Sequence, residues 1–379
     1  MAGMMTAVVA LAGLKWWQLN LRHITLTPIT PTAALRAPRI FHHLPGISQK
    51  FRPPFSASKK ALQNVQTALQ HGWAEGTVKN YGYTLDRFLR FCVEEKIPPK
   101  LQLPTDEFVL CAFAASGAGV HAGSTARNNI AALKAWHVAQ NQPWKGGSRL
   151  HYVLAGVENL APESSKRPPR PPINAAMLRV LYRGLDFTVP RDVAVFAAAC
   201  VAFWGQCRLG EILPISGSDT ALAHKPTRAH VSRSHRDKRA TKLRLPRTKT
   251  KKSGDDVVLV AQDKPIDPEI ALRMHLQVNC LPSSAPLFAD RTRAGFQTLT
   301  RPKFLQRCNE IWAAAGYPHT TGHSFRIGGT TELLLAEVAP DVVRAMGRWS
   351  SDAFHRYWRS LEDLAPIHAT HIGSARHSG

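Results

Sequence analysis

The apolar residues between positions 56 and 160 recur at helical spacing. Leu62, Val65 and Leu69 lie three and four positions apart, which puts them on one face of a helix. Three further helices are predicted to open at Thr77, Thr105 and Ser124, since each has a polar residue that can cap the first turn and an apolar stripe behind it. These patterns predict a small helical bundle over residues 56–160.

Prolines and charges replace this pattern over residues 161–173. The stretch APESSKRPPRPP at 161–172 suits neither a helix nor a central strand, because proline fixes φ and removes a backbone donor. We expect an interdomain linker here, followed by a second domain from residue 174.

Residues 174–379 combine helical and extended patterns. Asn174 can cap a helix, and residues 193–204 are so apolar that a buried helix is expected. Apolar and β-branched ends flank Ser253-Gly254 between residues 244 and 260, which predicts a β-hairpin. Further helices are predicted over 267–278, 301–315 and within 320–360. The second domain is therefore expected to be mixed α/β, mostly α with a small antiparallel sheet.

The net charge of the chain indicates what kind of partner it binds. The sequence has 49 Lys and Arg against 26 Asp and Glu, a formal net charge of +23. Such a surface favours a polyanion, with nucleic acid ahead of an acidic membrane face. Charge alone does not separate an enzyme from a histone-like or ribosomal protein.

The cysteines and the apolar runs narrow the class of protein. The six cysteines are scattered, and no two have the spacing of a zinc or redox site, so we expect reduced intracellular thiols and no bound metal. No apolar run approaches the roughly 20 residues that span a membrane. We therefore expect a soluble protein with no membrane partner.

Residues 1–55 are basic and contain no acidic residue. Three interpretations stay open: a mitochondrial transit peptide, a disordered arm that adds DNA affinity, or sequence annexed by an incorrect start site. The expected compartment depends on this segment. It is the nucleus in a eukaryote, the cytoplasm or nucleoid in a prokaryote, and the mitochondrion under the first interpretation.

Two short motifs place cationic side chains where an anion could bind. In TGHSFRIGG (321–329), His323 and Arg326 are three residues apart at the start of a predicted helix, whose free N–H groups also favour an anion. In WGQCRLGEIL (204–213), Arg208 follows an apolar helix and precedes Glu211 by three residues. Each pair has a simpler interpretation, as surface side chains in the first case and as a structural ion pair in the second.

A basic hairpin and an aromatic segment complete the candidate chemistry. The hairpin carries Arg244 and Arg247 before its turn and Lys249, Lys251 and Lys252 at it. A solvated or phosphate-contacting strip is the simplest interpretation, although burial could make one lysine a proton donor. Tyr357 lies in MGRWSSDAFHRYWRS (346–360), where a phenol of pKa about 10 needs a base and cations to become a nucleophile. An aromatic cluster that packs a helix is the alternative.

The motifs occur in one order along the chain: R-x-x-E at 208–211, RTKT at 247–250, GHSFRIG at 322–328, G-x-W-x-S at 347–351, and then Tyr357. In this order the chain resembles the tyrosine recombinase family of DNA breaking and rejoining enzymes, which includes the phage-type integrases, and within it the Cre-like branch. The resemblance covers residues 174–360. It implies a tyrosine recombinase catalytic fold there and a SAM-like core-binding domain for the helical bundle.

The resemblance also implies which residues make and break bonds. Tyr357 would attack the scissile phosphate, giving a 3′-phosphotyrosine and a free 5′-hydroxyl. His323 would accept the tyrosine proton, and Lys249 would protonate the leaving oxygen. Lys251 and Lys252 crowd the same turn, so either is the catalytic lysine if the register is shifted.

Other residues would stabilise charge. Arg208 and Arg326 would bind the non-bridging oxygens, and Trp349 would donate its indole N–H to one of them. Glu211 would support the site from behind. Four residues of the hairpin are expected to contact DNA: Arg244, Arg247, Lys251 and Lys252. The implied reaction needs no metal, cofactor or ATP, because the arginines stabilise the charge and the phosphotyrosine conserves the bond energy.

The resemblance implies double-stranded DNA as the partner and a homo-tetramer on paired DNA sites. The expected function is site-specific recombination or integration, as in a mobile element. Two alternatives stay open: a retired enzyme kept as a DNA-binding or regulatory protein, and a topoisomerase of the IB kind. Adduct formation and plasmid relaxation would distinguish them.

Overall fold

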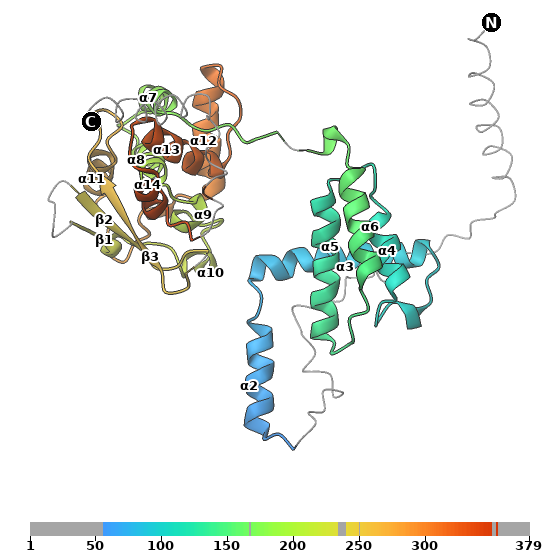
Figure 1. Cartoon of the computed structure of the whole chain (residues 1–379). Coiled ribbons are helices and arrows are strands. Elements are labelled where there is room, and N and C mark those ends of the chain that lie inside the picture. The colour runs from blue at the N-terminus through green and yellow to red at the C-terminus, as the bar shows by residue number, and fades with distance from the viewer. Residues whose placement is uncertain (1–55, 167, 234–239, 250, 351–353, 355–379) are drawn as a thin grey trace, which may run out of the picture. The chain divides into compact units, whose positions relative to one another are not determined.

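The computed structural model describes residues 56–354, except 167, 234–239, 250 and 351–353 (Figure 1). The chain divides into two compact units, Met1–Arg167 and Pro168–Gly379. The division falls inside the proline-rich stretch. Each unit has its own hydrophobic core.

The first unit is a bundle of helices packed through aromatic rings. Its helices are α2 (Lys59–Gln70), α3 (Glu75–Glu94), α4 (Glu107–Ala115), α5 (Gly123–Ala139) and α6 (Ser148–Asn159). Phe88 of α3 packs edge-on against Phe113 of α4 and Trp136 of α5, with ring centroids 5.2 and 6.1 Å apart. The predicted helical bundle is confirmed.

Two details of this bundle differ from the sequence pattern. Helix α3 begins at Glu75, before Thr77, because the Thr77 N–H already bonds the Ala74 carbonyl at 2.9 Å. On α2, Val65 and Leu69 remain 43% and 36% exposed, so its apolar stripe is not buried by the described part of the first unit.

The second unit places small antiparallel sheets among helices (Figure 1). Its helices are α7 (Ala175–Gly184), α8 (Pro190–Trp204), α9 (Leu209–Ile212), α10 (Asp219–Leu222), α11 (Pro268–Val278), α12 (Arg301–Ala314), α13 (Gly322–Leu335) and α14 (Pro340–Met346). Its strands are β1 (Val231–Arg233), β2 (Ala240–Leu245), β3 (Asp255–Val260), β4 (Ala289–Thr292) and β5 (Gly295–Thr298). The predicted fold class, mostly α with a small antiparallel sheet, is confirmed.

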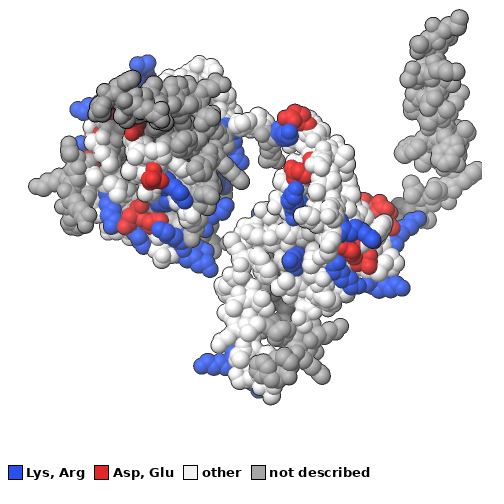
Figure 2. All heavy atoms as spheres, in the orientation of Figure 1, with Lys and Arg blue, Asp and Glu red and all other residues white. Residues whose placement is uncertain are grey.

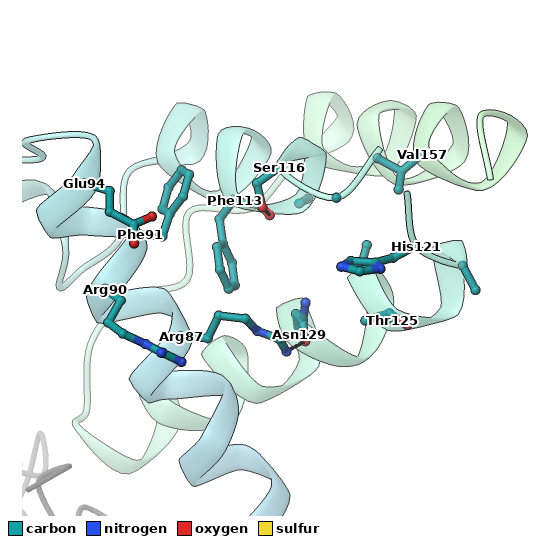
Figure 3. Close-up of a pocket in the computed structure, with 14 residues that line it drawn as sticks. Arg87, Arg90, Phe91, Glu94, Phe113, Ser116, His121, Thr125, Asn129 and Val157 are labelled. Carbon is teal, nitrogen blue, oxygen red and sulfur yellow. Dashed lines mark hydrogen bonds between the residues drawn. The ribbon is translucent and has the colours of Figure 1, made fainter. Parts of the chain in front are cut away.

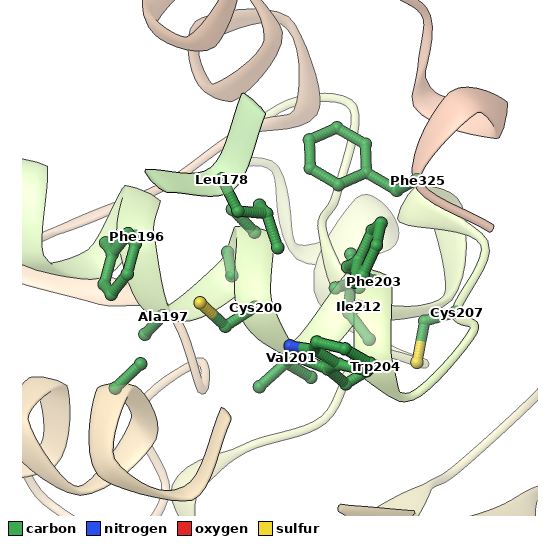
Figure 4. Packing of buried hydrophobic residues seen from close by; sticks show 14 of the residues in the cluster. Leu178, Phe196, Ala197, Cys200, Val201, Phe203, Trp204, Cys207, Ile212 and Phe325 are labelled. Carbon is green, nitrogen blue, oxygen red and sulfur yellow. The ribbon is translucent and has the colours of Figure 1, made fainter. Parts of the chain in front are cut away.

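Helix α8 lies at the centre of this unit. Every residue from Asp192 to Trp204 is buried, as the apolar sequence predicted. Figure 4 shows side chains of α8 packed among residues from neighbouring elements, including Leu178 of α7 and Phe325 of α13. Helix α13 approaches α8 very closely at Gly329, where a Cβ would overlap the Phe203 carbonyl. The absence of a side chain at Gly329 therefore allows α13 to pack against the end of α8, close to Arg208.

The three-stranded sheet has the order β1-β2-β3 and is antiparallel throughout. Leu243 and Leu245 of β2 are buried, whereas Lys242 and Arg244 are exposed. This alternation is typical of a strand with one buried face. The link from β2 to β3 is longer than the predicted turn at Ser253-Gly254. It runs over residues 246–254 and holds the candidate lysines.

Gly254 explains where this loop ends. Its φ is +79°, and a Cβ there would overlap the carbonyl oxygens of Leu245 and Pro246. Glycine is the residue that takes this conformation without strain. The Ser253-Gly254 pair therefore closes the hairpin loop at the start of β3 and is not its tip.

Buried His275 on α11 makes the second unit sensitive to acid. Its Nε2 lies 2.8 Å from the Leu287 carbonyl, and its Nδ1 lies 3.0 Å from the Asn279 amide nitrogen. Burial lowers the pKa of His275 to about 4. Since the unfolded pKa is about 6.5, the stabilisation is complete above that pH and is lost as pH falls towards 4.

We therefore expect the free energy of unfolding to fall by about 2 kcal/mol between pH 7 and pH 5 on account of His275. Urea titrations at both pH values measure it. The pH-dependent part should shrink in His275→Gln and persist in His319→Gln, an exposed control. An unchanged pH dependence in His275→Gln would contradict the assignment.

Candidate active site

Arg208 is held where α8 gives way to α9. Its side chain is 26% exposed, and its Nη1 donates to Glu211 Oε1 at 2.8 Å. The Arg208 backbone N–H donates to the other carboxylate oxygen at 3.0 Å. The ion pair considered from sequence is thus present. Among the described residues, however, Nε and Nη2 of Arg208 have no partner, so one edge of the guanidinium can bind an anion.

Two adjoining cavities open beside Arg208. The first cavity, of about 370 Å³, is also lined by Arg170 and by the start of α13, which includes His323. The other, of about 440 Å³, is lined by Glu211 and by Lys249 of the hairpin loop. The two cavities share Arg208, Gly210 and Arg301. Three candidate residues from distant segments, Arg208, Lys249 and His323, therefore line this pair of adjoining cavities, which we call the basic hollow.

The structure separates the three candidate lysines. Lys249 lines the second cavity together with Arg247. Lys251 instead pairs with Asp255 at 2.8 Å and is 59% exposed. Lys252 is exposed and lines neither cavity. Of the three candidate lysines in the hairpin loop, Lys249 is therefore the one that shares a cavity with Arg208.

Of the four expected DNA contacts, Arg247 lies at the hollow and Arg244 lies away from it. Arg244 Nη1 donates to Asp256 at 3.3 Å, and Lys242 pairs with the same carboxylate at 2.9 Å. Asp255 and Asp256 of β3 therefore neutralise part of the basic strip that the sequence shows on β2. Exposed ion pairs of this kind are weak, so these side chains remain available at the surface.

Arg326 is completely buried and lines neither of the two cavities. Its Nη1 donates to the Gln206 carbonyl and its Nη2 to the Gly347 carbonyl, both at 2.6 Å. These carbonyls follow the C-terminal ends of α8 and α14, where the helix dipoles favour a cation. The guanidinium also lies 3.8 Å from the Trp349 ring centroid, as in a cation–π contact. Arg326 thus ties together the two segments that lead to Arg208 and to Trp349.

Trp349 and Phe354 begin the aromatic segment. Their ring centroids are 5.3 Å apart, and Phe354 is buried, so packing of the kind considered from sequence is present. Trp349 also covers Arg326 and packs beside the main core of the second unit. Tyr357 lies outside the described residues, and its role stays a prediction from the motif.

Arg301 and Lys225 border the hollow and had not been singled out from sequence. Burial lowers the pKa of Lys225, and the nearby positive charges of Arg301 and Arg247 lower it further, while Glu211 opposes them. The Lys225 ammonium donates to the Gly210 carbonyl. Sequence offered only weak signals for these residues: Arg301 opens a predicted helix, and Lys225 falls in a long basic run. Figure 2 shows Lys and Arg at several places on the visible face of this unit, with Asp and Glu among them.

Cys207, next to Arg208, is not a competing nucleophile. Burial raises the pKa of its thiol to about 11, so it stays protonated near neutral pH. Within the described ranges there is no group of three or more His, Cys, Asp or Glu that could hold a metal ion. The metal-free reaction stays a prediction, because it rests on the resemblance.

The first unit has a separate cavity of about 390 Å³ between α3, α4 and α5 (Figure 3). Arg87 donates to Asn129 Oδ1 across it at 2.5 Å. Arg90 and His121 add basic character, and Glu94 is the acidic residue among its lining side chains. The cavity thus combines cations with hydrogen-bonding groups.

The fold is similar to solved structures of site-specific recombinases and integrases. One is the XerH site-specific recombinase bound to palindromic difH substrate in a post-cleavage complex, with 12% identity, a TM-score of 0.53 and coverage of 85% of each chain. Another is the Tn1549 transposon integrase in complex with transposon right end DNA, with 13% identity, a TM-score of 0.50 and coverage of 82% of this chain and 98% of that one. No family model matches the sequence, and no curated protein is significantly similar to it.

These likenesses establish the fold. The chain has the fold of these site-specific recombinases and integrases, as the tyrosine recombinase motifs predicted. Placement in the Cre-like branch stays a prediction. None of the helices in the described part of the chain is both long and apolar enough to cross a membrane.

Proposed function

We propose that this protein is a tyrosine recombinase, which cleaves and rejoins DNA strands through a 3′-phosphotyrosine at Tyr357. One observation carries the proposal. Arg208, Lys249 and His323, which are far apart in sequence, border one basic hollow in a fold shared with recombinases that were solved on DNA. A phosphodiester is the anion that would use all three.

The arginines would stabilise the charge that develops on the phosphate. Arg208 lines both cavities, and the guanidinium edge that has no partner among the described residues can form a forked pair with two phosphate oxygens. Arg326, which is buried and lines neither cavity, would add the positive field of its charge through the protein interior. Arg301, which lines both cavities, and Lys225, which lines the second, would contact neighbouring phosphates of the DNA backbone.

Proton transfer would involve His323 and Lys249. His323 lines the first of the two cavities and would take the proton of the Tyr357 hydroxyl. Lys249 lines the second cavity and would give a proton to the leaving 5′-oxygen. In this proposal the base and the acid are different residues, because an in-line displacement needs one at the attacking oxygen and the other at the leaving oxygen.

Duplex DNA is the proposed partner of both units. The net charge of +23 favours it, and the helical unit would add contacts through the basic cavity that holds Arg87, Arg90 and His121. A tetramer on paired DNA sites is proposed from the resemblance. We also propose a location where DNA is kept: the nucleus, the nucleoid or the mitochondrion.

The covalent adduct tests the nucleophile. Full-length protein is incubated with labelled random-sequence duplexes that have been lightly nicked, so that a strand freed beside a nick diffuses away and the adduct accumulates. We expect a protein–DNA species that persists in denaturant and is lost in Tyr357→Phe. Tyr152→Phe, at an exposed tyrosine of the first unit, is the matched control. An adduct that survives in Tyr357→Phe would exclude this nucleophile.

The same experiment separates the alternatives. A retired enzyme would bind the duplexes with a strong salt dependence and leave no adduct. A topoisomerase of the IB kind would form adducts with little sequence preference and relax supercoiled plasmid. A recombinase would enrich particular sequences in its adducts.

A further inference from the structure

Arg348 is a buried arginine that borders neither cavity of the hollow. It follows Gly347 at the end of α14 with a φ of 61°, a conformation that residues other than glycine seldom adopt. Its side chain is only 6% exposed. A buried guanidinium needs hydrogen-bond acceptors around it. Its partners therefore indicate what it does.

Those partners lie mainly on the segment that carries Arg208. The two terminal nitrogens of Arg348 donate to four acceptors at 3.1–3.3 Å: the carbonyls of Gly205, Gln206 and Met346, and Glu211 Oε2. Gly205 and Gln206 directly precede Cys207 and Arg208. A single side chain thus fastens the end of α14 to the segment between α8 and α9.

Glu211 is shared between two arginines. Its carboxylate is 4% exposed, with Oε1 at 2.8 Å from Arg208 Nη1 and Oε2 at 3.3 Å from Arg348 Nη2. One carboxylate between two guanidinium groups leaves a positive charge in excess. Without Arg348, the same carboxylate would balance Arg208 alone and would weaken its attraction for a phosphate.

We propose that Arg348 is a positioning residue for strand cleavage, which acts on Arg208 through Glu211. It takes up part of the carboxylate charge and fastens the backbone before Arg208, so that Arg208 stays oriented and cationic towards the hollow. This inference rests on the proposed function and adds to it a residue that does not touch the phosphate.

A double-mutant cycle tests the coupling. Single-turnover adduct formation is measured for full-length wild type, Arg348→Gln, Glu211→Gln and the double variant, on duplexes recovered from wild-type adducts. We expect Arg348→Gln to slow cleavage by about tenfold or more, as for residues in one ion-pair network. The double variant should cleave no more slowly than Arg348→Gln, because the unbalanced carboxylate is gone.

Arg344→Gln is the matched control. Arg344 also lies on α14, and within the described part of the chain its side chain forms no hydrogen bond or ion pair. Its replacement should leave cleavage within about twofold of wild type, as for a surface substitution. Thermal melts of every variant separate loss of fold from loss of rate.

Two outcomes overturn the inference. Losses that multiply in the double variant would mean that Arg348 does not act through Glu211, and an unchanged rate in Arg348→Gln would mean that it does not act at all. If Arg348→Gln does not fold, Arg348→Lys keeps the charge beside Glu211. Cleavage within about threefold of wild type then supports the inference, and a loss as large as that of Arg208→Ala overturns it. Absence of any adduct with wild type instead refutes the proposed function.

Discussion

Replacing Lys249 with alanine is expected to slow strand cleavage by at least about a hundredfold, because the leaving 5′-oxygen would lose its proton donor. The lysine borders the cavity that Arg208 also lines. Single-turnover adduct formation on a recovered duplex measures the rate. A substrate whose bridging 5′-oxygen is replaced by sulfur should restore most of it, since a thiolate leaves without a proton.

Neighbouring lysines provide the controls for this prediction. Lys251→Ala and Lys252→Ala should change the rate little, because Lys251 pairs with Asp255 and Lys252 lines neither cavity. Lys225 is the rival within the hollow, and its lowered pKa would also suit a proton donor. A large loss in Lys225→Ala that the sulfur substrate rescues, with none in Lys249→Ala, would transfer the role to Lys225.

Arg326→Ala is expected to abolish detectable cleavage and to lower the free energy of unfolding by about 4 kcal/mol. The stability loss follows because the carbonyls of Gln206 and Gly347 would lose buried donors, each worth about 1–3 kcal/mol. The rate loss follows because the field of a buried positive charge would disappear from the proposed site. Urea unfolding and adduct formation measure the two effects separately.

Arg326→Lys distinguishes charge from geometry at this position. A lysine keeps the charge, but its single ammonium nitrogen cannot replace the two separate guanidinium nitrogens that donate to the carbonyls of Gln206 and Gly347. We expect most of the stability loss to remain and part of the cleavage to return. Arg326→Ala with wild-type stability would contradict the packing described for this side chain.

The elements that surround the site were largely predictable because their signals are local. Asn174 accepts from the Met177 N–H at 2.9 Å, and Asp267 accepts from the Ile270 N–H at 2.8 Å, so these caps mark helix starts that the sequence indicated. The strands β4 and β5 were not predicted, because their hairpin is short and β5 is mostly exposed, which leaves no apolar alternation.

Some residues of the site could be identified from sequence motifs, and others only from the structure. Arg208, His323 and Arg326 stand out because short motifs carry them. Arg301 and Lys225 do not, since their place depends on contacts between segments that no local pattern relates. Arg348 occupies the variable second position of the G-x-W-x-S motif, so the motif gave it no role.

The sequence by itself determined the order of the helices, the basic character and the motif order that implies phosphotyrosine chemistry, because capping, periodicity and composition are properties of neighbouring residues. Only the tertiary structure decided which lysine borders Arg208 and which carboxylate is shared by two arginines. These depend on the close packing of α13 against α8 and on the acceptors left at helix ends, and such contacts form only when distant segments meet.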